Sequence, residues 1–139
     1  MALLFMVLWA SSCNLPKDQK ESLQEAKEKG LLVGVVENPP YVRTNNEKFE
    51  GKEVEILKNF AAVQGLDVKF VEDNESELLE KLEKYELHVV IGGFEKKTIW
   101  KRKSTPTVSY DGKHVFLVPN GENRLLKKIE TYIFKEVKE

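Results

Sequence analysis

Short apolar runs alternate along this chain with longer segments of helical period, and no other feature restricts the fold as much. The runs cover residues 31–37, 66–72, 87–93 and 113–119. Segments rich in helix-forming residues flank them, at 19–29, 53–65, 75–86 and 122–137. Strands separated by helices of this length are joined by right-handed crossovers. The pattern therefore predicts an α/β fold with a mostly parallel sheet of about four to five strands and helices on both faces.

Residues that begin and end helices stand at the borders of these segments. Asp18 with Glu21 forms a capping-box pattern, and Asn74 can cap the third helical segment. Gly30 and Gly65 are placed to end the first two helices. The paired prolines and the Asn and Gly residues of 38–52 favour a loop with turns.

Composition excludes several classes of protein. The chain has 139 residues, of which 41% are hydrophobic and 32% charged, as in a single globular domain. Its net charge of −1 provides no general attraction to nucleic acid. One Cys and two His exclude a zinc-type ligand spacing and a disulfide scaffold. No motif for a cofactor or metal is present, so we expect none.

The N-terminal residues have the pattern of an export signal. Residues 2–10 are continuously apolar but too short for a bilayer span, and every charged residue follows Cys13. The small residues before Cys13 resemble a bacterial lipoprotein cleavage box. We therefore expect a signal peptide at 1–12, a lipidated tether at 13–18 with the lipid on Cys13, and one lobe at 19–139. A buried N-terminal segment with a free thiol is the alternative.

The predicted strand ends carry the candidate ligand-binding residues. In open α/β sheets, ligands bind outside the carboxyl ends of the strands. Glycines there let a ligand approach the backbone, aromatic rings provide flat walls, and carboxylates can accept hydrogen bonds from an amine. The candidates are Glu37, Pro40, Tyr41, Gly93, Phe94, Glu95, Trp100 and Tyr110.

Three stretches, "LLVGVVENPPYV", "EGKEVEILKNFAAVQGLDVKFVE" and "ELLEKLEKYELHVVIGGF", resemble the first lobe of bacterial periplasmic solute-binding proteins. The resemblance is to the extracellular family that captures polar amino acids for ABC transporters. "KHVFLVPNGENRLLKKIETYI" is similar to the segment that returns to that lobe. The resemblance implies one lobe of a type II periplasmic-binding-protein fold, with Tyr110 at the position that closes the site.

The chain also departs from the family pattern. The second lobe of these proteins is inserted before the returning segment, where only about residues 104–113 are found here. The family's Gly-x-Thr turn corresponds to Gly93, Phe94 and Glu95, and its carboxylate-binding Arg corresponds to Trp100. A Trp offers no bidentate fork to a carboxylate. Tyr85 and His88 replace the usual Gly and Asp.

Some conspicuous residues have simpler explanations. The cations Lys96, Lys97, Lys101, Arg102 and Lys103 can attract an anionic ligand or lipid headgroups, or form a solvated loop. His88 and His114 are expected to be structural residues of the sheet. Asp73 and Asn74 are expected to cap a helix.

Together these features predict a lipid-anchored binding protein on the extracytoplasmic side of a bacterial envelope. It would take part in ABC transport and capture a small polar, amino-acid-like solute weakly or with a partner. The partner could be a permease, a sensor protein or a second copy. The alternative is a protein-interaction or sensory module without solute binding. A dehydratase-like enzyme is less favoured, because an open lobe excludes little water.

Overall fold

The computed structural model describes residues 18–137, which form four α-helices and seven strands. The elements follow the order α1 (Ser22–Lys29), β1 (Leu31–Val35), β2 (Arg43–Asn45), β3 (Lys48–Glu50), α2 (Lys52–Gln64), β4 (Val68–Glu72), α3 (Glu75–Glu83), β5 (Val89–Glu95), β6 (Thr105–Pro106), β7 (His114–Val118) and α4 (Asn123–Tyr132). A 3₁₀ turn, η1 (Ile99–Arg102), precedes β6, and a π-helical turn, η2 (Ile133–Val137), extends α4. The expected signal peptide and Cys13 lie outside the described residues.

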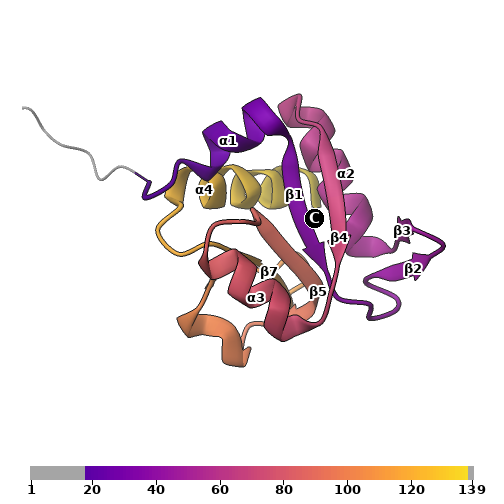
Figure 1. The fold of residues 1–139 in the computed structure, drawn as a ribbon. Helices are drawn as coiled ribbons and strands as arrows, with labels where there is room; N and C mark the ends of the chain where they lie inside the picture. The colour runs from indigo at the N-terminus through magenta and orange to yellow at the C-terminus, as the bar shows by residue number, and fades with distance from the viewer. Residues whose placement is uncertain (1–17, 138–139) are drawn as a thin grey trace, which may run out of the picture.

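Five strands form one mixed sheet in the order β4-β1-β5-β7-β6 (Figure 1). β1 pairs in parallel with β4 and β5, whereas β7 runs antiparallel to β5 and β6. The α/β class is confirmed, and so is the central place of the Val-rich first strand. The alternating strand at 68–72 lies at an edge, as its half-polar pattern predicts. β7, in the segment that returns to the lobe, makes the remaining part of the sheet antiparallel.

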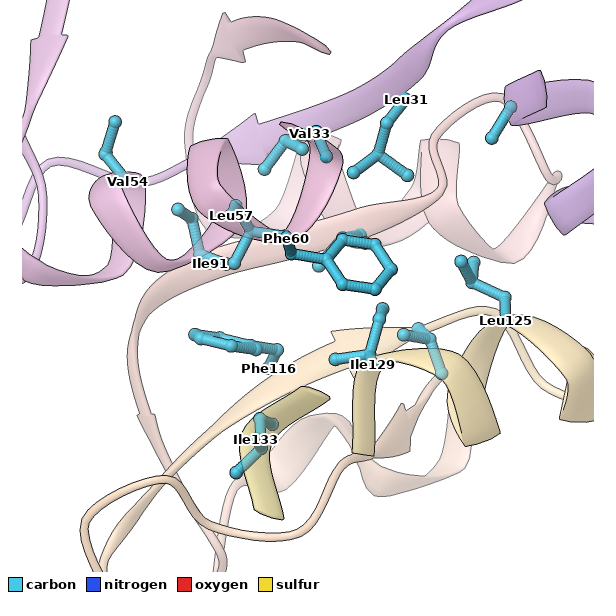
Figure 2. Close-up of a cluster of buried hydrophobic side chains, with 14 of the residues drawn as sticks. Leu31, Val33, Val54, Leu57, Phe60, Ile91, Phe116, Leu125, Ile129 and Ile133 are labelled. Atoms are coloured by element: carbon cyan, nitrogen blue, oxygen red, sulfur yellow. The ribbon is translucent and has the colours of Figure 1, made fainter. Parts of the chain in front are cut away.

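Successive residues of a strand face opposite sides of the sheet, and this divides the core in two. On one side α1, α2 and α4 cover Leu31, Val33 and Ile91, with Phe60 of α2 lying among them (Figure 2). On the other side α3 packs its leucines against Val90 and Leu117. The expectation of helices on both faces is thus confirmed.

The loop predicted at 38–52 contains a small hairpin, formed by β2 and β3. Its two connecting residues, Asn46 and Glu47, both have positive φ, as a tight hairpin turn of the mirror-image type requires. Phe49 of this hairpin contacts Phe70 of β4 at 5.7 Å between ring centroids. The hairpin therefore packs against the edge of the main sheet.

The capping box expected at Asp18 and Glu21 is wrong. The Asp18 carboxylate instead accepts hydrogen bonds from the backbone N–H groups of Asn123 and Arg124, at the start of α4. Glu122, which precedes α4, accepts hydrogen bonds from the backbone of Lys20 and Ser22 at the start of α1. Each helix is thus capped by a residue that precedes the other, because their N-termini lie side by side.

The other predicted helix ends agree with the structure. The Asn74 side chain accepts a hydrogen bond of 2.9 Å from the Glu77 N–H and caps α3. Gly30 and Gly65 follow α1 and α2, and Gly65 takes the left-handed conformation typical of a helix stop. Within residues 18–137, no helix combines the length and apolar character needed to cross a membrane.

Candidate functional site

The carboxyl end of β5 is a crowded corner centred on Gly93. Gly93 has a φ of 70°, and a Cβ atom there would lie 2.6 Å from both Asn38 Nδ2 and Tyr41 Cδ2. Asn38 also donates a hydrogen bond of 2.9 Å from its amide to the Gly92 carbonyl. Only glycine combines this conformation with this close approach, so the Gly-Gly pair places the β1 loop directly against β5.

Glu53, in the first turn of α2, anchors this corner from within the protein. Its side chain is fully buried, and Oε1 accepts hydrogen bonds from the N–H groups of Gly92, at 3.1 Å, and Gly93, at 2.8 Å. Oε2 accepts a hydrogen bond of 2.9 Å from the Tyr110 hydroxyl. Burial raises the pKa of the Glu53 carboxyl, and these hydrogen bonds offset part of that rise. The two glycine donors thus already have a carboxylate partner.

An aromatic and polar cluster continues from Glu53 across the sheet end. The Tyr110 and His114 rings stack at 6.1 Å, and Tyr41 lies 4.4 Å from His114. Asp111 Oδ2 lies 2.5 Å from His114 Nδ1. Burial opposes the charge of Asp111, but hydrogen bonds from His114 and Lys113 lower its carboxyl pKa below the usual value. His114 thus lies in β7, as expected, and also joins this cluster.

Three of the candidate residues lie on the loop after β1. Tyr41 is half-buried, and its backbone carbonyl accepts a hydrogen bond from the Glu53 N–H. Pro40 is exposed and follows a cis Pro39–Pro40 bond. Glu37 is exposed, and its Oε1 lies 3.5 Å from the Thr44 N–H. The Tyr41 ring and the Glu37 carboxylate are therefore available at the surface of this sheet end.

Four other candidate residues do not form the expected surface walls of the site. Phe94 is 5% exposed and packs in the α3-side core, while Tyr110 is 3% exposed. These rings are interior, because the strand alternation and the Glu53 hydrogen bond turn them inward. Glu95 is exposed and pairs with Lys113 at 3.3 Å. Trp100 is half-buried and packs against the core on the α3 side of the sheet, called the α3-side core below.

Tyr85 and His88 have structural roles at the opposite end of the sheet. Tyr85 has a φ of 62°, in the left-handed region that glycine adopts most easily, and its hydroxyl donates hydrogen bonds to Gln19 Oε1 and the Asn120 carbonyl. Buried His88 accepts a hydrogen bond of 2.9 Å at Nδ1 from the Leu32 N–H. Nε2 lies 3.4 Å from Glu25, too poorly aligned for a hydrogen bond. Burial lowers the pKa of His88, which favours a neutral ring.

Asp73 and Asn74 lie after β4, beside the start of α3. The Asp73 Oδ1 accepts the Asn74 N–H at 2.8 Å, which supports the expected capping role. A surface hollow elsewhere at this end is lined by Glu95, Lys96, Lys97, Gly112 and Lys113. Among the described residues, no group of His, Cys, Asp and Glu has the arrangement of a metal site.

Sequence reasoning missed the central residue of this corner, Glu53. The helical spacing predicts only that Glu53 belongs to an amphipathic helix. Glu53 nevertheless shares a helix face with Leu57 and Phe60, four and seven positions later. A carboxylate on the buried face of a helix requires partners, and that was the available signal. The identity of those partners could not be read from the helix alone.

Comparisons with known proteins agree with this architecture. Residues 31–139 match the family of bacterial extracellular solute-binding proteins, family 3. The arginine-bound form of domain 1 from TmArgBP is 24% identical with a TM-score of 0.71, over 80% of this chain and 97% of that chain. A truncated arginine-bound ArgBP from T. maritima, 14% identical, has a TM-score of 0.72, over 83% of this chain and 100% of that chain.

A further similar structure is that of a protein described as the precursor of an enzyme. AncCDT-1, an ancestral amino acid-binding protein described as a precursor of cyclohexadienyl dehydratase, is 11% identical with a TM-score of 0.74. The alignment covers 83% of this chain and 92% of that chain. No curated protein matches the chain. The family match spans most of the sequence and the fold is that of one lobe, so the chain belongs to the bacterial extracellular solute-binding proteins, family 3.

Proposed function

We propose that this chain is a non-enzymatic solute-binding lobe, lipid-anchored through Cys13 on the extracytoplasmic side of a bacterial envelope. The family match over residues 31–139 is the observation that carries the proposal, since the family consists of extracellular solute-binding proteins. A cationic, amino-acid-like solute is the ligand class that we favour, and an ABC permease, a sensor or a second copy would be the partner.

Two observations favour a cationic solute. The similar lobe of TmArgBP was solved in its arginine-bound form, and this chain shares its fold. In this chain Glu37, after β1, and Glu72, at the end of β4, both lie beside Thr44. Glu37 Oε1 accepts a hydrogen bond of 3.5 Å from the Thr44 N–H, and Glu72 Oε1 accepts one of 3.3 Å from the Thr44 hydroxyl. Neither carboxylate forms an ion pair with a described cation. A guanidinium or amine there would gain favourable charge interactions.

The same corner is poorly suited to a ligand carboxylate. The N–H groups of Gly92 and Gly93 are satisfied by Glu53, and Trp100 replaces the family's arginine. We therefore propose that recognition concentrates on the basic end of the solute. One lobe covers one side of a ligand, whereas tight sites bury most of the ligand surface. Binding should be weak unless a partner supplies the second wall.

Catalysis is not part of the proposal, despite the similarity to a dehydratase precursor. Glu53 is the described carboxylate at this corner with a raised pKa, but its oxygens already bind Gly92, Gly93 and Tyr110. Exposed Glu37 lies at an open surface. General acid–base catalysis needs a positioned carboxylate in a site that excludes water.

Isothermal titration of the full chain with arginine, agmatine and glutamate tests the proposal. Agmatine keeps the guanidinium of arginine but lacks its carboxylate. We expect arginine and agmatine to bind with similar dissociation constants, roughly micromolar or weaker, and glutamate to give no heat. Glu37→Gln should weaken both cations about fivefold, the equivalent of roughly 1 kcal/mol for an exposed charge pair.

Glu47→Gln is the matched control, because Glu47 is an exposed acid in the β2–β3 turn and should leave both affinities unchanged. Submicromolar binding by a proven monomer would contradict the open-lobe argument. Tight glutamate binding, or equal effects of the two variants, would contradict the cationic ligand class.

A further inference from the structure

A basic strip formed by residues 96–103 has chemistry that the solute site does not use. It contains Lys96, Lys97, Lys101, Arg102 and Lys103, all of which are exposed. Four of them, all but Lys103, form no ion pair with a described carboxylate. Lys103 lies 4.0 Å from Glu83. The strip therefore presents a concentrated positive charge to its surroundings.

The basic strip also exposes an unusual apolar side chain. Ile99, in the 3₁₀ turn η1, is 83% exposed and is the most exposed large hydrophobic residue among those described. The next residue, Trp100, is half-buried against the α3-side core, which holds the turn to the lobe. The Trp100 carbonyl accepts hydrogen bonds from the Lys103 N–H and the Ser104 hydroxyl. An exposed apolar side chain is thus presented on a defined turn, within a segment that carries five exposed cations.

Hydrogen bonds place the end of this strip beside the start of the described chain. The Asn120 side chain donates to the Arg102 carbonyl at 3.1 Å, and the Asn120 carbonyl accepts from the Tyr85 hydroxyl at 2.9 Å. The Tyr85 hydroxyl in turn bonds to Gln19. In Figure 1, the orange turn η1 and the indigo start of the described chain both lie at the left of the lobe. Five peptide steps from Cys13 to Asp18 reach at most about 18 Å.

We propose that the basic strip docks the lobe on an anionic lipid bilayer, with Ile99 entering the interfacial region. Unpaired cations near an anionic membrane are attracted to its surface, and exposed apolar side chains bury themselves at the headgroup boundary. The orientation of the lobe rests on the proposed lipid anchor, because the tether would hold this same end near the membrane.

Lysine acylation of the full mature chain on vesicles, read by mass spectrometry, tests this surface. Vesicles of phosphatidylcholine alone are compared with vesicles that also contain phosphatidylglycerol. We expect Lys96, Lys97 and Lys101 to react about fivefold or more slowly on the anionic vesicles, the factor that corresponds to the attraction of one cation. High salt should abolish this protection. Lys127 and Lys128 of α4 serve as internal controls and should react equally on both.

A pair of matched variants separates docking from general charge attraction. Ile99→Ser should reduce the protection, whereas Val63→Ser, at a site 65% exposed on α2, should not. Flotation with phosphatidylcholine vesicles reports separately on the lipid anchor, so failure of the anchor is distinguishable from failure of the basic strip. Equal acylation on both vesicle types, protection of the α4 lysines instead, or equal protection by free glycerol phosphate would overturn the proposal.

Discussion

Glu53 shows how one buried side chain can define the shape of a sheet end. Its carboxylate accepts three hydrogen bonds, from two backbone N–H groups and one tyrosine hydroxyl, and so links α2 to the end of β5. Buried polar groups that are fully paired give a site a single geometry, and unpaired ones are costly. The positions of Gly93 and Tyr41 therefore depend on a residue that a solute would not touch.

The raised pKa of Glu53 predicts a specific pH dependence of stability. Above the ordinary glutamate pKa of 4.5, the unfolded chain releases the proton while the folded chain retains it up to the raised pKa. The folded state then binds more protons, so the free energy of unfolding falls as the pH rises through this interval. Glu53→Gln lacks this titration and should lack this part of the fall.

Urea denaturation of wild type and Glu53→Gln at a series of pH values from 4.5 upward provides the measurement. The difference between the two curves isolates Glu53, since other groups titrate in both proteins. Glu55→Gln, on the exposed side of the same helix, should follow the wild type. Parallel curves for wild type and Glu53→Gln would show that Glu53 is not the titrating group.

At the scale of elements, the reciprocal capping of α1 and α4 joins the two ends of the lobe. Asp18 binds the first N–H groups of α4 at 3.1 and 3.0 Å, and Glu122 binds backbone N–H groups at the start of α1. Acidic side chains are favourable at helix N-termini because of the unpaired donors and the helix dipole. The N-terminal helix is therefore held by charge-assisted hydrogen bonds as well as by Leu23 and Ala26.

Loss of one cap should destabilise the lobe measurably. We expect Asp18→Ala to lower the free energy of unfolding by about 1–2 kcal/mol in chemical denaturation, the range for helix N-caps. Asn123→Ala, on the same turn but without a capping side chain, should change it by less than about 0.5 kcal/mol. The double variant Asp18→Ala/Glu122→Ala should lose less free energy of unfolding than the sum of the two single variants, because either substitution weakens the same contact between α1 and α4. Strict additivity would argue against reciprocal coupling.

Prediction from sequence succeeded for elements with a clear period and failed where distant segments meet. Residues 31–35 and 75–83 were identified because their apolar pattern and Asn74 suffice locally. The hairpin strands have three residues each, too short for a period, although Asn46 marked a turn. Asp18 was assigned to its own helix because nothing local reveals that α4 begins beside it. Phe94 was placed at the surface for the same reason.

At the scale of the whole molecule, two cores on opposite faces of one sheet should unfold together. β5 and β7 contribute residues to both cores, so neither can be lost without disrupting the shared strands. Because both cores are built on the same sheet, we expect the domain to unfold in a single cooperative transition. The structure is thus one folding unit with two apolar layers.

Substitutions in the two cores test this unity. Phe60→Ala in one core and Leu79→Ala in the other should each lower the free energy of unfolding by about 2–5 kcal/mol. Circular dichroism and the fluorescence of Trp100, which packs on the α3-side core, should give coincident denaturation curves for both variants. Val63→Ala, at an exposed position, should have little effect. Curves that separate would indicate independently unfolding layers.

The pairing of β5 with β7 has a practical consequence. Glu95 and His114 are partners across adjacent antiparallel strands, and the chain between them also contributes β6, which pairs with the other edge of β7. Residues can be inserted in the 96–104 connection without removing the pairing of β7 with β5 or with β6. A reporter domain grafted into this connection should therefore leave the five-stranded sheet intact.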